Sequence, residues 1–227
     1  MVKTILLVED EDILREISKD YFINAGYNVL EARNGIEAIE VFEHNHVDLI
    51  VLDIMMPELD GWSVCKKVRE HSMIPIIILT ARSDEDDTLL GFELGADDYV
   101  TKPYKPKILL ARVKRLLQAQ SIEGIEKEES NLKSGQLEVS LDSRIVLVNN
   151  EEVSLTHTEF EILVYLMMNR NVVITREQII MKIWDYEYAG DDRTINTHIR
   201  NLRSKLGDHS SKIKTIVRSG YKFEDRA

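Results

Sequence analysis

The 227-residue sequence lacks the features of a membrane or secreted protein. It has no run of about 18 apolar residues, which a transmembrane helix requires. Its N-terminus has no basic region and cleavage site of a signal peptide. Only one cysteine is present, Cys65, whereas secreted domains more often carry paired thiols. We therefore expect a cytoplasmic protein without a membrane partner, and we expect Cys65 to be a buried thiol.

Acidic residues are almost absent from one segment, although the formal net charge of the chain is -11. From 193 to 222 only Asp208 opposes eight Lys and Arg residues, and 193–206 contain no Asp or Glu. A solvated helix would more often place Glu among its Lys and Arg to form i,i+4 pairs. A basic face on an acidic protein is typical of a nucleic-acid-binding surface. The segment therefore predicts contact with DNA.

Residues 1–120 alternate short apolar runs with amphipathic stretches, in the order of an α/β domain. The runs are 5–8, 29–30, 49–52, 76–79 and 99–100, and the stretches are 11–25, 35–45, 61–71, 84–94 and 106–119. Continuous apolar runs need burial on both faces of a sheet. The pattern predicts a doubly wound, five-stranded parallel sheet covered by helices. The polar segment 121–131 is typical of a charged linker.

Residues 132–227 have the pattern of a winged helix-turn-helix domain. Short alternating runs in 132–155 predict a small antiparallel sheet. The pairs Thr156 with Glu159 and Thr175 with Gln178 have capping-box spacing, and they open predicted helices at 156–168 and 175–184. In the first of these, positions 160, 163, 164, 167 and 168 form the apolar face. A third helix at about 191–206 and a hairpin at 213–223 complete the pattern.

Charged side chains follow three of the apolar runs in the first domain. Asp53 ends one run, Glu9 and Asp10 follow another, and Lys102 follows a third. Ligands of an open parallel sheet bind beyond the carboxyl ends of its strands. Asp10 and Asp53 can share a Mg²⁺ ion, with Glu9 helping through water. Asp53 can then act as a nucleophile toward a phosphoryl donor, while Lys102 neutralises charge and Thr80, which ends a further run, supplies a hydroxyl.

These residues lie in motifs that resemble the receiver domain of two-component response regulators. The motifs are Val8-Glu9-Asp10-Glu11, Asp53-Ile54-Met55-Met56-Pro57 with Asp60-Gly61, Thr80-Ala81-Arg82, and the segment from Gly95 to Pro103. The resemblance spans residues 1 to about 120. It implies that a sensor histidine kinase phosphorylates Asp53, that the main-chain carbonyl of Met55 completes the metal site, and that Thr80 and Lys102 contact the phosphate. It also implies that Tyr99 is a switch residue that turns inward with Thr80.

The predicted helix over 193–206 separates an apolar stripe from a polar face. On a wheel of 100° per residue, positions 195, 199, 202 and 206 form the stripe. Arginine can pair with guanine, asparagine with adenine, and threonine with phosphate or a thymine methyl. The predicted DNA-contacting residues of the polar face and its flanks are Arg193, Thr194, Asn196, Thr197, His198, Arg200, Asn201 and Arg203.

Residues 132 to about 225 resemble the effector domain of the OmpR/PhoB class, above all between Trp184 and Gly207. The resemblance implies a third helix in the major groove, a wing in the adjacent minor groove with Arg218 and Tyr221, and a loop at 185–191 that touches RNA polymerase. The wing departs from the family pattern, because Val217 stands where Arg is expected and Arg218 where Gly is expected.

The resemblance also implies that phosphorylation produces a homodimer on tandem half-sites of promoter DNA. The usual pairing face joins a basic residue to a glutamate, and here those positions are Thr88 and Ile108. Asp98 and Arg112 remain as residues that could pair across subunits.

Two other functions stay open at this point. A metal-dependent phosphohydrolase would need a second Asp two residues after Asp53, where this chain has Met55. A phosphate-independent dimerisation module would not need the complete set of Asp10, Asp53, Thr80 and Lys102. The sequence favours a phosphorylation-switched transcription factor over both, and over an enzyme.

Overall fold

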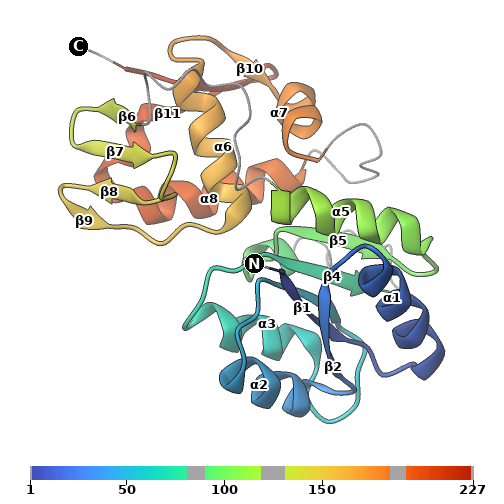
Figure 1. Ribbon diagram of the computed structural model, residues 1–227. Coiled ribbons are helices and arrows are strands. Elements are labelled where there is room, and N and C mark those ends of the chain that lie inside the picture. Colours follow the sequence, from blue (N-terminus) through green and yellow to red (C-terminus); the bar gives the residue numbers. More distant parts are fainter. Residues whose placement is uncertain (1, 81–89, 119–130, 185–192, 226–227) are drawn as a thin grey trace. The chain divides into compact units, whose positions relative to one another are not determined.

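The computed structural model describes residues 2–80, 90–118, 131–184 and 193–225, with the side chains of 118 and 193 left out. The chain forms two compact units, Met1–Ser121 and Ile122–Ala227. Figure 1 shows both units. Most of the predicted linker, 121–131, and most of the predicted helix at 84–94 lie outside the described residues.

The first unit is built on a five-stranded parallel sheet, as predicted. Its strands are β1 (Thr4–Val8), β2 (Asn28–Ala32), β3 (Leu49–Asp53), β4 (Ile76–Thr80) and β5 (Asp98–Thr101), in the spatial order β2-β1-β3-β4-β5. Every neighbouring pair is parallel. β3 and β4 are buried along their whole length, because helices cover both faces of the sheet.

Helices pack on the two faces of this sheet in pairs (Figure 1). α1 (Asp12–Asn24) and α5 (Pro106–Gln118) bury Phe22 and Leu109 against one face. α2 (Gly35–His44) and α3 (Gly61–Arg69) bury Ala38 and Val64 against the other. Cys65 on α3 is completely buried, as expected, and burial raises the pKa of its thiol to about 11.

The second unit contains two small sheets and three helices among its described residues. β6 (Asn131–Ser134), β7 (Leu137–Ser140), β8 (Val146–Val148) and β9 (Glu151–Glu152) form the predicted antiparallel sheet. α6 (His157–Met168) and α7 (Arg176–Ile183) each begin with the predicted capping box. α8 (Arg193–Leu206) is followed by a 3-10 helix, η1 (Gly207–Lys212), and by the hairpin of β11 (Ile213–Ile216) and β12 (Gly220–Phe223).

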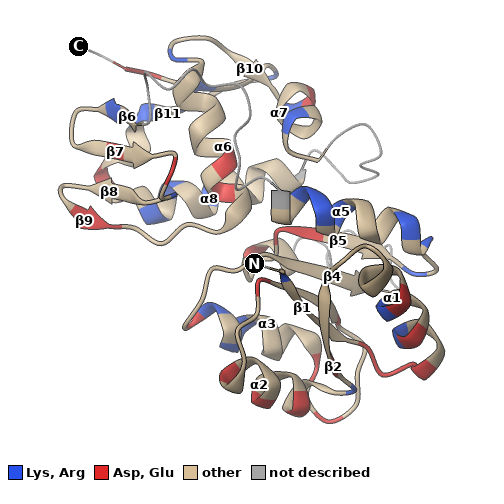
Figure 2. Ribbon diagram, in the orientation of Figure 1, with Lys and Arg blue, Asp and Glu red and all other residues tan. Residues whose placement is uncertain are grey.

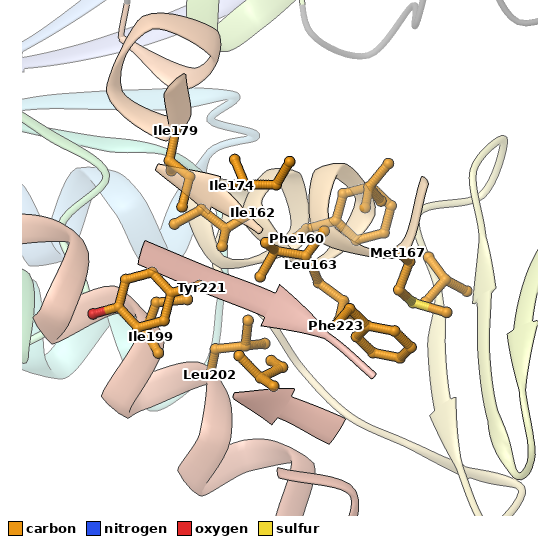
Figure 3. Packing of buried hydrophobic residues seen from close by; sticks show 14 of the residues in the cluster. Phe160, Ile162, Leu163, Met167, Ile174, Ile179, Ile199, Leu202, Tyr221 and Phe223 are labelled. Atoms are coloured by element: carbon orange, nitrogen blue, oxygen red, sulfur yellow. The ribbon is translucent and has the colours of Figure 1, made fainter. Parts of the chain in front are cut away.

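The core of the second unit lies between α6, α8 and β12 (Figure 3). The predicted apolar face of α6 was wrong at Met168, which is exposed, and it left out Ile162 and Leu166, which are fully buried. α6 contacts other elements on more than one side, so its buried face is wider than a single stripe.

The hairpin pairs with a third strand that the sequence did not indicate, β10 (Ile174–Thr175). At Gly220 the two backbones approach so closely that a Cβ atom would lie 2.0 Å from the carbonyl oxygen of Ile174. Gly220 also has a φ of +154°, a conformation that side-chain-bearing residues rarely adopt. Only glycine therefore allows this pairing, which joins the wing to the residue that caps α7, Thr175.

Candidate functional site

Asp53 ends β3 at the carboxyl edge of the parallel sheet, and its carboxylate is held from two sides. Its Oδ1 accepts the main-chain N–H of Met55 at 2.9 Å, and its Oδ2 accepts Nζ of Lys102 at 2.6 Å. The side chain is 2% exposed. The loop after β3 folds back closely, because a Cβ on Gly61 would lie 2.3 Å from the main-chain oxygen of Asp53. The position of this carboxylate is therefore fixed by packed backbone.

Lys102 and Glu9 complete a compact group of charges around Asp53. Nζ of Lys102 also donates to Oε1 of Glu9 at 2.7 Å, and Glu9 is fully buried. Burial raises the pKa of Glu9 to about 7, and the charge of Asp53 adds to that rise, while Lys102 opposes it. Burial opposes the charged form of Lys102, but the hydrogen bonds to Asp53 and Glu9 outweigh it and raise the pKa of the amine. Lys102 therefore remains a cation beside the carboxylates.

Glu9, Asp10 and Asp53 bring carboxylate oxygens within 4.8 Å of one another. Glu9 and Asp53 are buried, and Asp10 is exposed. Oε2 of Glu9 is buried without a hydrogen-bond partner among the described residues. A divalent cation with hard oxygen ligands would relieve both the repulsion and this unsatisfied oxygen, so the residues fit Mg²⁺.

Arg15 of α1 supports the acidic group, and no pattern in the sequence indicated this role. Arg15 is 5% exposed, and its guanidinium donates to the main-chain oxygens of Glu9 at 2.9 Å and Asp10 at 3.4 Å. It also pairs with Asp12 and lies 3.5 Å from Glu31. An arginine in the first turns of an amphipathic helix ordinarily faces solvent, so only the folded structure identifies it.

Thr80 and Tyr99, the predicted switch pair, line one small recess together with Trp62, Phe92 and Ala96. Thr80 ends β4 and is 2% exposed. The Tyr99 ring is partly buried and meets the Phe92 ring edge-on, with centroids 5.8 Å apart. The structure thus brings the two residues to one cavity beside the carboxylate edge.

α8 presents a basic surface in the second unit, and Figure 2 shows Lys and Arg on this helix. Asn196 and Arg200 are exposed, and Asn201 and Arg203 are half-buried. The side chain of Arg193 lies outside the described residues.

Three residues that the helical wheel placed on or beside the exposed face are instead buried: Thr194, Thr197 and His198. His198 stands three residues after Ile195 and four before Leu202, so it borders the apolar stripe. Its ring lies 5.5 Å from the ring of Trp184, and Thr194 stands one turn earlier on the same edge. Burial lowers the pKa of His198 to about 3. His198 is therefore a neutral core residue here, and the expectation that its ring faces DNA is corrected.

The chain is similar to known proteins along nearly its whole length. The response regulator receiver domain matches residues 5–114, and the C-terminal domain of transcriptional regulatory proteins matches 150–223. The transcriptional regulatory protein SrrA of Staphylococcus aureus (strain NCTC 8325 / PS 47) is 42% identical over 232 aligned positions, which cover 99% of this chain and 96% of SrrA. The chain belongs to the OmpR/PhoB class of response regulators.

Solved structures of response regulators agree with this assignment. DrrB, a Thermotoga maritima OmpR/PhoB homologue, is 31% identical, with a TM-score of 0.54 over 99% of this chain and 100% of that one. A mutant of RitR is 26% identical, with a TM-score of 0.75 over the same shares. Receiver domains bind Mg²⁺ at an acidic pocket, and in this chain Glu9, Asp10 and Asp53 form the corresponding cluster. None of the described helices is long and apolar enough to cross a membrane.

Asp98 and Arg112, the residues predicted to pair across subunits, contact each other within the chain. Asp98 is fully buried and accepts Nη1 of Arg112 at 2.8 Å and Nη2 of Arg115 at 3.2 Å. A carboxylate that is buried at a strand start needs a cation nearby, and α5 of the same unit supplies two. That Asp98 also pairs with Arg112 of another subunit stays a prediction. Of the other two residues on that face, Ile108 is partly buried and Thr88 lies outside the described residues.

The wing of this response regulator has an unusual tip. Val217 is 79% exposed, and Arg218 has a φ of +62°, in the left-handed region that the glycine of the family pattern would adopt without strain. Tyr221 is only 3% exposed, so its ring packs in the core and does not reach outward as expected. The loop at 185–191, predicted to touch RNA polymerase, lies outside the described residues.

Proposed function

We propose that this response regulator is switched by phosphorylation of Asp53 and that phosphorylation tightens its binding to promoter DNA. The observation that carries the proposal is the pairing of Asp53 with Lys102 at 2.6 Å inside a three-carboxylate cluster. The same chain carries a basic helix in a second unit. A receiver implies a sensor histidine kinase as partner, and the DNA-binding domain implies promoter DNA. A promoter target in turn implies a cytoplasmic protein.

Phosphoryl transfer to Asp53 depends on positioning and charge neutralisation. An oxygen of Asp53 forms the new bond to phosphorus as the bond to the donor nitrogen breaks and its electron pair stays with the kinase histidine. Mg²⁺ held by Glu9, Asp10, Asp53 and the main-chain carbonyl of Met55 would supply positive charge. Lys102 contributes a second cation, and Thr80 offers its hydroxyl to the phosphate.

Incubation with acetyl phosphate and Mg²⁺ tests this step without the kinase. Intact-mass measurement should show one added phosphoryl group, mapped to Asp53, and Asp53→Asn should remain unmodified. Asp60→Asn is the matched control, because Asp60 is an acidic cap of α3 and asparagine keeps that cap. Persistent modification of Asp53→Asn, or none of the wild type, would refute the proposed site. An unmodified wild type that still binds DNA would favour a phosphate-independent module.

The switch is proposed to act through Thr80 and Tyr99. Phosphate at Asp53 stabilises the arrangement in which Thr80 moves toward it and Tyr99 turns into their shared cavity. That arrangement favours pairing of two receivers through the face that includes α5. Sedimentation with beryllofluoride as phosphate mimic should show a dimer. A protein that stayed monomeric at tens of micromolar would contradict this step.

Pairing would place two winged helices on half-sites about 10 bp apart, roughly one turn of DNA. Affinity then rises because the second unit binds at high effective concentration. We also propose that the loop at 185–191 contacts RNA polymerase at the promoter.

A further inference from the structure

The exposed asparagine of α8 is held in one orientation by two neighbours. Oδ1 of Asn196 accepts the hydroxyl of Tyr221 at 2.6 Å and Nε of Arg176 at 3.4 Å. An amide oxygen has two lone pairs, so these donors account for its accepting capacity. Within the part of the chain that the structure describes, the Asn196 amide nitrogen donates to no protein group. Asn196 therefore presents two N–H donors and no acceptor.

This arrangement is anchored by the fold. The Tyr221 ring packs beside Ile199 with its hydroxyl directed away from the apolar cluster (Figure 3). Guanidinium groups flank the ring, with Arg176 at 5.2 Å and Arg203 at 5.8 Å from its centroid. Arg203 is in turn fixed by a 2.7 Å bond to the main-chain oxygen of Ile213.

The three elements meet because β10 pairs with β12. That pairing sets Ile174 opposite Tyr221 and Thr175 opposite Gly220, and the guanidinium of Arg176, the first residue of α7, lies over the Tyr221 ring. Asn196 is the fourth residue of α8, and base contacts of a helix-turn-helix come from the N-terminal part of this helix. The corner formed by Asn196, Tyr221 and Arg176 thus lies where bases are read.

We propose that Tyr221 and Arg176 make Asn196 a donor-only reader, which selects guanine over adenine at one position of each half-site. An asparagine recognises adenine by accepting from N6 while donating to N7, and here the accepting oxygen is already occupied. Guanine offers two adjacent acceptors, N7 and O6, to the free N–H groups. Adenine would oppose one of them with its own N6 donor. Tyr221 and Arg176 are positioning residues and touch no base.

Selection from a random duplex DNA library, using the full chain with acetyl phosphate and Mg²⁺, tests the inference. Asn196→Ala should remove the preference at a single position, which identifies the base that Asn196 reads. At that position the wild type should prefer guanine. Tyr221→Phe keeps the ring and removes the hydroxyl, and it should lower the ratio of guanine to adenine affinity at least about fivefold, with other positions unchanged. Tyr165→Phe, on α6, is the control and should leave the profile unaltered.

The outcomes separate this inference from the DNA-binding function on which it rests. Enrichment of no sequence at all would contradict DNA binding itself. Adenine at the identified position, an unchanged profile for a folded Tyr221→Phe, or no change at any position for Asn196→Ala would overturn only the reading role. If Tyr221→Phe lowers the melting temperature into the assay range, Arg176→Leu removes the other donor and should shift the same position in the same direction.

Discussion

The carboxylate edge of the receiver and the exposed polar face of α8 are built in opposite ways. Asp53, Glu9 and Lys102 come from strand ends far apart in the sequence, and parallel pairing brings them to one edge. The polar face of α8 comes from a single helix, yet the exposure of its side chains is decided by what packs around it. Trp184 covers His198, and β12 places Tyr221 beneath Asn196. A site set by sheet topology is thus more predictable than a surface set by side-chain packing.

In each unit, burial shifts the pKa of one residue in the direction that favours its neutral form. In the receiver, burial raises the pKa of Glu9, a ligand-type carboxylate that keeps an unsatisfied oxygen. In the DNA-binding unit, burial lowers the pKa of His198, which is a structural residue. The first shift lies at a functional site and the second in a core, so a shifted pKa alone does not identify function.

The largest expected effect comes from disrupting the close contact between the backbones of β10 and β12 at Gly220. Gly220→Ala should destabilise the DNA-binding unit by about 3 kcal/mol or more, because the new Cβ would meet the Ile174 oxygen and φ would remain unfavourable. Gly207→Ala is the matched control, since Gly207 also has a positive φ but has no atom within 4 Å of its Cβ position. That control should cost about 1 kcal/mol. Urea unfolding measures both, and equal costs would contradict the steric account.

A second test measures how the stability of the DNA-binding unit depends on pH. The pKa of His198 is about 3 in the folded state against about 6.5 unfolded, so below pH 6.5 the unfolded state binds more protons. Stability of the DNA-binding unit should therefore fall by about 2 kcal/mol between pH 7 and pH 5. Unfolding followed by Trp184 fluorescence in a Trp62→Phe background measures this loss.

Removal of the imidazole should remove that pH dependence. His198→Gln should flatten the stability profile between pH 5 and 6.5, whereas His46→Gln, at an 87% exposed position of the receiver, should leave it unchanged. An equally steep profile in His198→Gln would show that His198 is not the buried titrating group.

The smallest expected effect concerns the wing tip, where strain is local and exposed. Arg218→Gly should stabilise the unit by about 1 kcal/mol, because glycine adopts a φ of +62° without a Cβ clash. Arg218→Ala removes the same charge but keeps the strain, so its stability should stay near that of wild type. Thermal unfolding compares the pair, and a stabilised alanine variant would assign the effect to charge.

The sequence predicted most of the fold, because the spacing of apolar residues and the positions of capping and turn residues indicated the same elements. The receiver strands, the capping boxes at Thr156 and Thr175, and the pocket residues all appeared in the pattern. β10 was missed because a strand of two residues is too short to show an alternation of apolar and polar side chains. The role of Arg15 was missed because the sequence does not distinguish a buried arginine from an exposed one. His198 was wrongly assigned to the exposed side because a helical wheel represents one helix alone and does not include Trp184, whose ring packs against it.

The intramolecular pairing of Asp98 was also beyond the sequence. The sequence indicated Arg112 as a partner across subunits, and the structure shows that Arg112 and Arg115 both reach Asp98 within the chain. The resemblance to the family indicated Arg112 alone, so the second arginine, Arg115, was missed.

The central claim is that phosphate at Asp53 controls DNA affinity, and a titration of the full chain against its selected duplex tests it most directly. With acetyl phosphate and Mg²⁺, the wild type should bind roughly tenfold or more tightly than without, within the usual range of coupling between sites. Asp53→Asn should bind with the same affinity under both conditions. Equal tightening in Asp53→Asn, or none in a wild type shown to be phosphorylated, would contradict the account.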